Sequence, residues 1–490
     1  GSDQTGNPEP IANSQLLTAD TNAADSAGTK IPRTKISEKL GFLTFSGSNN
    51  IVYQFKSLYY LFFLTNVLML DMFWAGIILT IGTVWDAIND PLLGFWAVNR
   101  RFKNGEAVRP YALWYSIPWA ITVVLLFSDF GLQETPALVV ALIIYILFEV
   151  FNTFVGIPYN SMAGLATDLD QDRRSINVFR NLGGGLGSAI GALACLPLLQ
   201  LFGALDNKGN LVDAGAPRGF FIVAIIMGVI VIVGSFVHYF TTSERVHQIS
   251  EDVQRISAQT IAKMLVHCRS WWYNMVYIIC YGVINLLLMT CLAYYATYIM
   301  GSTGAATMVQ AAYLVSSVLS SLIVGLVDRA IGRRFTMMAG AIVAILGKIW
   351  FVIDPFSAGA IYVNAVSVGI SATFAFVLFN TNRNNIVDIL EAQHGRRIDS
   401  MIATSDNLAS KLATAGATIM ISSSLEMAGF DAQLAVQPDA VISTINFMLG
   451  WAPLIASVIM LVTVYFLPIE KDYAAARIVL DQRHQKEDKN

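Results

Sequence analysis

Residues 219–240 read GFFIVAIIMGVIVIVGSFVHYF, a stretch without Asp, Glu, Lys or Arg. A helix of about 20 predominantly apolar residues is long enough to cross the hydrocarbon core of a bilayer, which is about 30 Å thick. The stretch therefore predicts a transmembrane helix.

Similar apolar stretches lie on both sides of this one. Five precede it, near residues 49–70, 73–97, 110–128, 136–163 and 180–203. Six follow it, near residues 271–299, 307–327, 335–353, 357–379, 402–424 and 443–467. Six spans, a polar connection and six more spans are the layout of a two-half transporter. We therefore expect an all-α membrane protein with twelve transmembrane helices.

This layout predicts five parts of the chain. They are a disordered cytoplasmic tail (1–38), an N-terminal six-helix bundle (39–240), a cytoplasmic connection (241–270), a C-terminal six-helix bundle (271–467) and a cytoplasmic tail (468–490). Four apolar residues of the connection recur at helical spacing, which predicts an amphipathic helix on the membrane surface or against the bundle. They are Val246, Ile249, Val253 and Ile256.

The composition agrees with a membrane protein and excludes several other classes. Of 490 residues, 55% are hydrophobic and 13% charged, against about 25% charged in soluble domains. The net charge of −3 gives no reason to expect a nucleic-acid partner. The four cysteines form neither a disulfide framework nor a metal-binding motif. Because no His-Glu-x-x-His pair or Gly-x-Ser-x-Gly elbow occurs, we do not expect an enzyme.

Basic residues between the spans predict the orientation, because cytoplasmic loops are enriched in Lys and Arg. One side of the membrane would carry only Lys208 and Arg218. The other side would carry sixteen basic residues: Arg100, Arg101, Lys103, Arg109, Arg173, Arg174, Arg245, Arg255, Lys263, Arg269, Arg329, Arg333, Arg334, Arg383, Arg396 and Arg397. We therefore expect both termini in the cytoplasm.

Two acids interrupt the span 73–97. Residues 85–91 read WDAINDP, which places Asp86 and Asp90 one helical turn apart with Asn89 beside them. An ionised side chain in hydrocarbon costs about 2.5–3.5 kcal/mol, so its default interpretation is functional. Two carboxylates this close remain ionised only if a cation lies between them; otherwise one holds a proton. Oxygen ligands suit a hard cation, and the alternative is a helix end exposed to cytoplasmic water.

Other polar groups lie within the predicted spans. Glu149 and Thr153 are one turn apart in the fourth span, Lys56 lies in the first and Lys411 in the eleventh. Lys348, near the outer end of the ninth, is expected to extend its ammonium group to the membrane surface. Glycines in the fifth span predict close helix packing, with a flexible gating joint as the alternative. They are Gly183, Gly184, Gly185, Gly187 and Gly191.

Several motifs together resemble the glycoside–pentoside–hexuronide:cation symporters, the family of melibiose permease. The run 85–91 is the most specific of them, and the resemblance extends over about residues 38–470. The corroborating matches are Ile157-Pro158-Tyr159, Arg180, Asn385-Ile-Val-Asp388, Gly395-Arg396-Arg397-Ile-Asp399-Ser400 and Lys411. The resemblance implies a major facilitator fold and a plasma-membrane symporter that takes up a sugar with Na⁺, Li⁺ or H⁺ by alternating access. We expect it to be a monomer.

The resemblance also implies a cation (metal) site made of Asp86, Asn89, Asp90 and Thr153. All four residues are retained, and the retained amide oxygen of Asn89 favours Na⁺ over a proton. Sugar contacts depart from the family pattern, because two family carboxylates and a stacking Trp are replaced by Asn50, Gly156 and Asn160. Carboxylates bind sugar hydroxyls through charge-assisted hydrogen bonds, so their loss argues against a neutral galactoside. The expected substrate-binding residues are Asn50, Tyr53, Lys56, Glu149, Gly156, Asn160, Arg180, Phe376 and Lys411.

Charge balance in the expected cavity favours an anionic glycoside or hexuronide. Three acids and three basic side chains are expected there: Asp86, Asp90 and Glu149, and Lys56, Arg180 and Lys411. Their charges cancel, so a bound Na⁺ leaves one positive charge that an anionic substrate would balance. We expect Lys56 and Glu149 to pair, leaving Arg180 and Lys411 for the substrate carboxylate. The alternative is that Lys56 and Glu149 each reach the surface or pair elsewhere. Other functions that remain open are symport of a neutral di- or oligosaccharide, transport of a lipid-like solute and sugar sensing without transport.

A cytoplasmic charge network is expected to hold the two halves together in the outward-open state. Residues 325–334 read GLVDRAIGRR, which resembles the Gly…Asp-Arg…Gly-Arg-Arg loop of the major facilitator superfamily, one residue short; the alternative is an ordinary basic turn. Exposed ion pairs contribute only about 0–1 kcal/mol each, so several must act together. The expected gating residues are Arg173, Arg174, Asp328, Arg329, Arg333, Asp388, Arg397 and Asp399.

Overall fold

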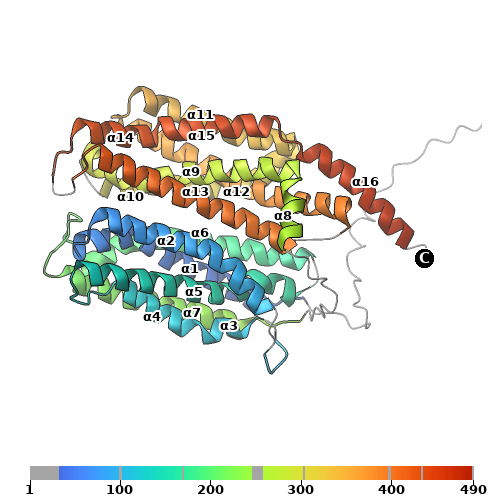
Figure 1. Cartoon of the computed structure of the whole chain (residues 1–490), viewed down its shortest axis with the longest axis horizontal. Helices are drawn as coiled ribbons and strands as arrows, with labels where there is room; N and C mark the ends of the chain where they lie inside the picture. Colours follow the sequence, from blue (N-terminus) through green and yellow to red (C-terminus); the bar gives the residue numbers. More distant parts are fainter. Residues whose placement is uncertain are drawn as a thin grey trace, which may run out of the picture.

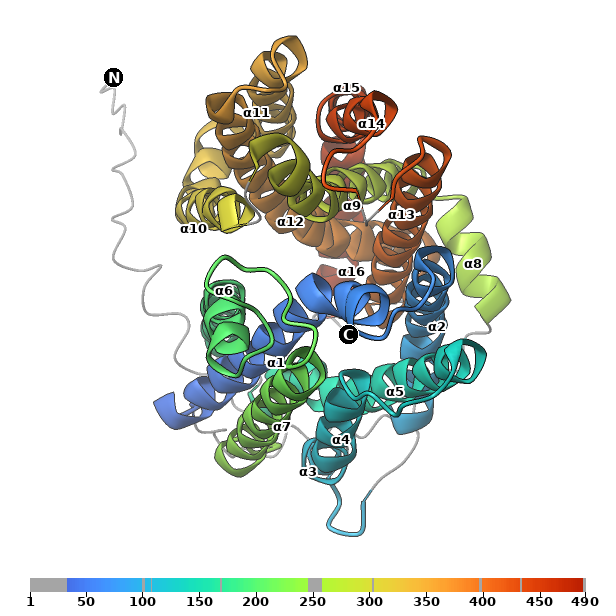
Figure 2. The ribbon, with the colours of Figure 1, turned by 90° about the vertical axis from the view of Figure 1, so that its left-hand side faces the viewer.

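The computed structural model describes residues 33–98, 102–106, 108–167, 170–245, 258–301, 304–395, 399–431 and 434–487. The helices form two layers, α1–α7 in one and α9–α15 in the other, with their long axes roughly aligned (Figure 1). Helices α8 and α16 lie at the same end of the molecule (Figure 1). The end-on view in Figure 2 shows the two groups of helices facing each other.

The first layer follows the order of the chain. Its helices are α1 (Ile36–Phe62, continued by the π-helical turn η2, Phe63–Val67), α2 (Met72–Val98), α3 (Pro110–Trp114), α4 (Ser116–Leu126), α5 (Glu134–Ala166), α6 (Asp170–Leu201) and α7 (Ala216–Thr241). Pro91 lies inside α2, and the helix continues through it to Val98.

After the described residues resume at 258, α8 (Ala258–Val266) precedes the second layer. The helices of this layer are α9 (Arg269–Tyr295, continued by η3, Ala296–Met300), α10 (Gly304–Ile331), α11 (Arg333–Ile353), α12 (Ala358–His394), α13 (Asp399–Met427), α14 (Asp439–Leu449) and α15 (Trp451–Tyr465). Helix α16 (Ile469–Glu487) follows the layer. The predicted stripe of Val246, Ile249, Val253 and Ile256 lies outside the described residues.

The expected all-α membrane fold is confirmed. Within the described ranges nine helices are long and apolar enough to cross a membrane. Each of the twelve apolar stretches lies on helical residues. Three of them are not among the nine: α1 and α13 carry more polar residues, and the stretch near 110–128 is divided between the shorter helices α3 and α4. The same ranges contain no strand beyond one isolated bridge, Leu205 with Leu211.

Close packing of α6 depends on three of the five glycines for which it was predicted, and the partner helix is α1. A Cβ at Gly183 or Gly187 would lie 2.3 Å from the backbone oxygen of Leu43 or Gly47, respectively. A Cβ at Gly191 would lie 3.0 Å from the backbone of Ile51. These three glycines therefore allow the two helix backbones to touch.

Lys348 is not where the sequence placed it. Its side chain is fully buried, and its Nζ donates a hydrogen bond to the carbonyl oxygen of Ala344, 3.0 Å away. The expectation of an ammonium group at the membrane surface is therefore wrong. Residue position relative to the helix end does not reveal that the side chain faces the interior of the bundle.

Candidate functional site

Helix α2 presents the predicted acids on one face. Asp86 and Asp90 are partly exposed, with 19% and 34% of their side chains accessible, whereas Asn89 is buried. The i, i+4 spacing of a continuous helix brings the two carboxylates together, as the sequence predicted.

Thr153 of α5 joins Asn89 to Asp90. Asn89 Nδ2 donates to Thr153 Oγ1 at 2.9 Å and contacts the carbonyl oxygen of Glu149 at 3.3 Å. Thr153 Oγ1 lies 2.7 Å from Asp90 Oδ1 and 3.0 Å from the carbonyl oxygen of Glu149. A hydroxyl has one proton to donate, so it donates to only one of these two acceptors at a time. The structure thus brings together all four predicted cation-site residues.

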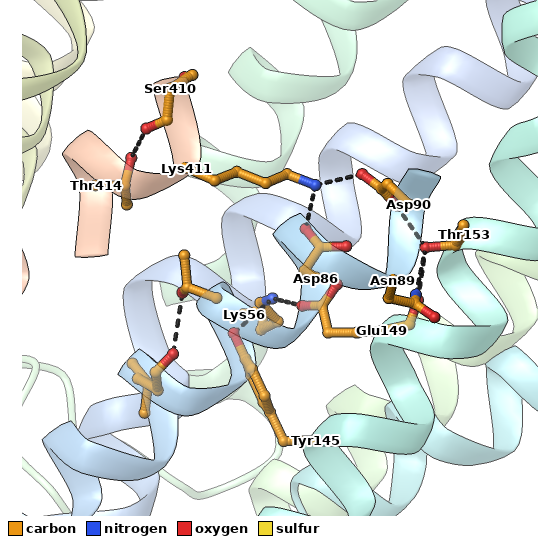
Figure 3. Close-up of polar contacts among 12 residues, drawn as sticks. Lys56, Asp86, Asn89, Asp90, Tyr145, Glu149, Thr153, Ser410, Lys411 and Thr414 are labelled. Carbon is orange, nitrogen blue, oxygen red and sulfur yellow. Dashed lines mark hydrogen bonds and ion pairs between the residues drawn. The ribbon is translucent and has the colours of Figure 1, made fainter. Parts of the chain in front are cut away.

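Lys411 crosses from the second layer to both carboxylates. Its Nζ lies 2.6 Å from Asp86 Oδ2 and also forms an ion pair with Asp90 Oδ2 (Figure 3). Because α13 and α2 belong to different layers, this cluster links the two halves through charge. The Lys411 ammonium group is thus the positive charge that contacts both acids.

A second ion pair lies beside the first and is formed by Lys56 of α1 and Glu149 of α5. Lys56 Nζ lies 3.1 Å from Glu149 Oε1 and donates to the hydroxyl oxygen of Tyr145 at 3.2 Å. The two charged side chains are only 13% and 5% exposed. The rings of Tyr145 and Phe148 flank the ammonium group, with centroids 4.8 and 4.9 Å from Nζ. The hypothesis that Lys56 and Glu149 pair with each other therefore agrees with this geometry.

The cluster gathers oxygen atoms of several kinds around the two α2 acids. Carboxylate, hydroxyl and amide oxygens are ligands for hard cations. Among the described residues no group of three or more His, Cys, Asp or Glu side chains is arranged as a metal-ligand set. A cation here would therefore use the two α2 carboxylates together with neutral oxygens, in competition with the Lys411 ammonium group.

The other expected substrate contacts are spread over α1, α5, α6 and α12. Asn50 Nδ2 donates to Ser46 O at 2.8 Å, and the Arg180 guanidinium lies 4.1 Å from the centre of the Tyr159 ring. Tyr53, Asn160 and Phe376 are exposed, and Gly156 has no side chain to contribute. Of these residues Tyr53 approaches the ion-pair cluster, with its ring centre 6.0 Å from Lys56 Nζ.

A cavity in the described part of the chain lies away from these residues. It measures about 250 Å³ and is bounded by the ends of α1, α4 and α5, with Tyr60, Ser128 and Asp129 among its lining residues. None of the predicted site residues lines it.

The predicted gating residues are placed only in part. Arg333 forms an ion pair with Asp328 at 3.3 Å and donates to Asn382 Oδ1 at 3.1 Å, all within the second layer. Arg329 is exposed, Asp388 lies in α12, and Arg397 lies outside the described residues. The side chains of Arg173, Arg174 and Asp399 are also outside the described part. A lock between the halves stays a prediction.

Sequence reasoning missed two side chains of the cluster and one buried ion pair elsewhere. Tyr145 and Phe148, which contact Lys56, precede Glu149 on α5 by four residues and one residue, and the i, i+4 rule could have identified Tyr145. Asp406 of α13 is buried and pairs with Arg383 of α12 at 2.7 Å. Asp406 lies in an apolar stretch, so the same reasoning that identified Asp86 could have found it.

Two facing layers of membrane-spanning helices and a polar cluster at their junction define a membrane transporter. A model of the family described as MFS/sugar transport protein matches residues 47–471, so the chain belongs to that family and is not an enzyme. Two curated relatives are similar over most of their length. The isoprimeverose transporter of Lactiplantibacillus pentosus is 25% identical over 455 residues, which is 92% of each chain. YagG of Escherichia coli, assigned as a glycoside/cation symporter, is 25% identical over 461 residues, 91% of this chain and 95% of its own.

A solved structure supports the fold. A bacterial homologue of the human lysosomal transporter Spinster, in an inward-facing unoccupied conformation, superposes with a TM-score of 0.56 at 15% identity. The match covers 91% of this chain and 97% of that one. Similarity at this identity concerns the fold alone.

Proposed function

We propose that this chain is a secondary active symporter that couples inward flow of a cation to uptake of a sugar across the plasma membrane. The cation that we propose is Na⁺. The observation that carries the proposal is the Lys411 ammonium group of one half bound to Asp86 and Asp90 of the other. The names of the curated relatives support a sugar as the transported solute.

This contact suggests how cation binding is coupled to movement of the halves. A monovalent cation carries the same charge as the Lys411 ammonium group and can replace it between Asp86 and Asp90. The hydroxyl of Thr153 and the amide of Asn89 hold the acid side of the site in place through their hydrogen bonds. The replacement frees Lys411 and removes an ion pair between the halves, so ion binding and rearrangement depend on each other.

Neutralising one acid tests this assignment. In proteoliposomes, Asp86→Asn or Asp90→Asn should abolish Na⁺-driven accumulation and retain some counterflow, because exchange requires no net ion movement. Asp71→Asn, at an exposed acid just before α2, is the matched control and should behave as the wild type. Full Na⁺-dependent accumulation by both site variants would reject the cation site.

We infer further that the sugar is anionic, a hexuronate or a glucuronide. With Lys56 paired to Glu149, the positive groups left for a substrate are Arg180 and the Lys411 ammonium group that the cation releases. A substrate carboxylate would pair with the released ammonium group, which would otherwise remain uncompensated in a region of low dielectric constant. Cation and substrate would then bind cooperatively.

A comparison of charged and neutral ligands decides the substrate class. Screening labelled hexuronates, glucuronides and neutral glycosides should give uptake of an acid, and its methyl ester should be taken up far more slowly. Arg180→Gln should narrow the difference between acid and ester. Equal uptake of the acid and its ester would instead favour a neutral di- or oligosaccharide.

A further inference from the structure

The region of the proposed cation site contains more carboxylate groups than one monovalent cation can neutralise. Among the described residues, Asp86, Asp90 and Glu149 meet two ammonium groups there, those of Lys56 and Lys411. Glu149 borders the proposed cation site, because its main-chain oxygen contacts Asn89 and Thr153. Its side chain therefore carries a third carboxylate next to that site.

The two ammonium groups differ in the half of the molecule that carries them. Lys411 belongs to α13 and meets acids of the other half, so a movement between the halves can separate the pair. Lys56 and Glu149 both belong to the first layer, on α1 and α5. Rocking of one half against the other therefore leaves the Lys56–Glu149 pair intact.

The surroundings of Lys56 resemble a fixed site for a cation. Glu149 supplies a carboxylate oxygen, Tyr145 a hydroxyl oxygen, and the rings of Tyr145 and Phe148 two aromatic faces. Aromatic faces and oxygen atoms stabilise a positive charge that is removed from water. The position is thus equipped to hold one monovalent positive charge next to the proposed site.

We propose that Lys56 is a tethered substitute for a second transported cation, because its ammonium group permanently neutralises Glu149 and limits the symporter to one free cation. This inference rests on the proposed function and assigns the stoichiometry of the same site. Without the charge of Lys56, Glu149 would be a buried, unpaired carboxylate, which is strongly unfavourable. It would then bind a Na⁺ ion or a proton from solution.

Removing the charge of Lys56 should therefore add one cation to the protein. We would measure equilibrium binding of labelled Na⁺ to purified protein and, by infrared spectroscopy, the carbonyl band of protonated carboxyl groups. Lys56→Met should bind two Na⁺ ions where the wild type binds one, or bind one and show an additional protonated-carboxyl band. Lys348→Met removes another buried ammonium group, in α11, and should leave both readouts unchanged.

The double variant Lys56→Met/Glu149→Gln removes both charges and avoids an unpaired buried group, so it guards against misfolding of the single variant. It should bind the wild-type number of Na⁺ ions and lack the additional band. An unchanged count and spectrum in Lys56→Met would overturn the inference, as would loss of Na⁺ binding in the double variant, which would make Glu149 a ligand of the transported ion. Failure of the proposed function is separate, because it would appear as absence of Na⁺ binding in the wild type.

Discussion

Thr153 is the residue through which the α5 side of the cluster reaches the acids of α2. Its hydroxyl accepts a hydrogen bond from Asn89 and lies within hydrogen-bond distance of Asp90. A side chain that contacts both an amide and a carboxylate can orient them even when it is not itself charged. The contribution of the hydroxyl group should therefore appear in cation affinity more than in the maximal rate.

Replacing this hydroxyl by a methyl group tests the role of Thr153. Thr153→Val should raise the Na⁺ concentration for half-maximal uptake about tenfold, the effect of losing about 1.4 kcal/mol of hydrogen bonding. Thr153→Ser keeps the hydroxyl and should stay within about twofold of the wild type. The measurement is initial uptake against Na⁺ concentration in proteoliposomes, and equal Na⁺ dependence of the two variants would contradict the assignment.

At the scale of elements, the contact between α1 and α6 positions one wall of the N-terminal half. Gly187 lies so close to Gly47 that any side chain would meet main-chain atoms, which cannot rotate away. Gly185, two residues earlier, has open space where a Cβ would be. The two glycines therefore differ in packing although they are neighbours in the same helix.

Alanine at these two positions should have different effects on stability. Gly187→Ala forces the helices apart and should destabilise the protein by about 1–3 kcal/mol, the usual consequence of overpacking. Gly185→Ala should be neutral or stabilising by up to about 1 kcal/mol, since Ala favours helix over Gly. Thermal denaturation of the purified variants in one detergent measures both, and equal midpoints would contradict the packing argument.

At the scale of the molecule, each half has its own apolar interior. One cluster of buried side chains lies entirely between Ile261 and Ala476, and two others lie between Phe42 and Val231. Helices α2 and α13 pack against each other between the halves, and Lys411 adds its ion pairs there. The halves can therefore move as units only if the α2–α13 contact changes.

A cross-link between α2 and α13 tests this requirement. A Cβ at Gly76 would lie 3.7 Å from Ser422 Oγ, which suits a disulfide in Gly76→Cys/Ser422→Cys. Oxidation should stop uptake, and a reductant should restore it. Cross-linking Gly282→Cys/Ala413→Cys should leave uptake largely intact, because both residues belong to the second half and a Cβ at Gly282 would lie 3.3 Å from that of Ala413. Unimpaired uptake by the oxidised α2–α13 variant would contradict movement between the halves.

Several features could be predicted without a structure because they depend on neighbours in sequence. The membrane-spanning helices follow from long apolar stretches, and the shared face of Asp86 and Asp90 follows from the helical repeat. The glycine contacts of α6 follow from the absence of a side chain, although the sequence did not reveal which of the five glycines touch α1. Lys348 was misplaced because the direction in which a side chain points depends on the surrounding helices.

The sequence by itself determined that this chain is an all-helical membrane protein with two acids inside a predicted membrane-spanning helix, since hydrophobicity and helical spacing are local properties. The sequence predicted the Lys56–Glu149 pair with an alternative, and it assigned Lys411 to a substrate carboxylate. Only the tertiary structure decided which of these charges meet. Lys56 and Glu149 are 93 residues apart, and Lys411 and Asp90 are 321 residues apart. Such pairs form because burial excludes water and leaves each charged group dependent on whichever partner the packing of the helices brings within reach.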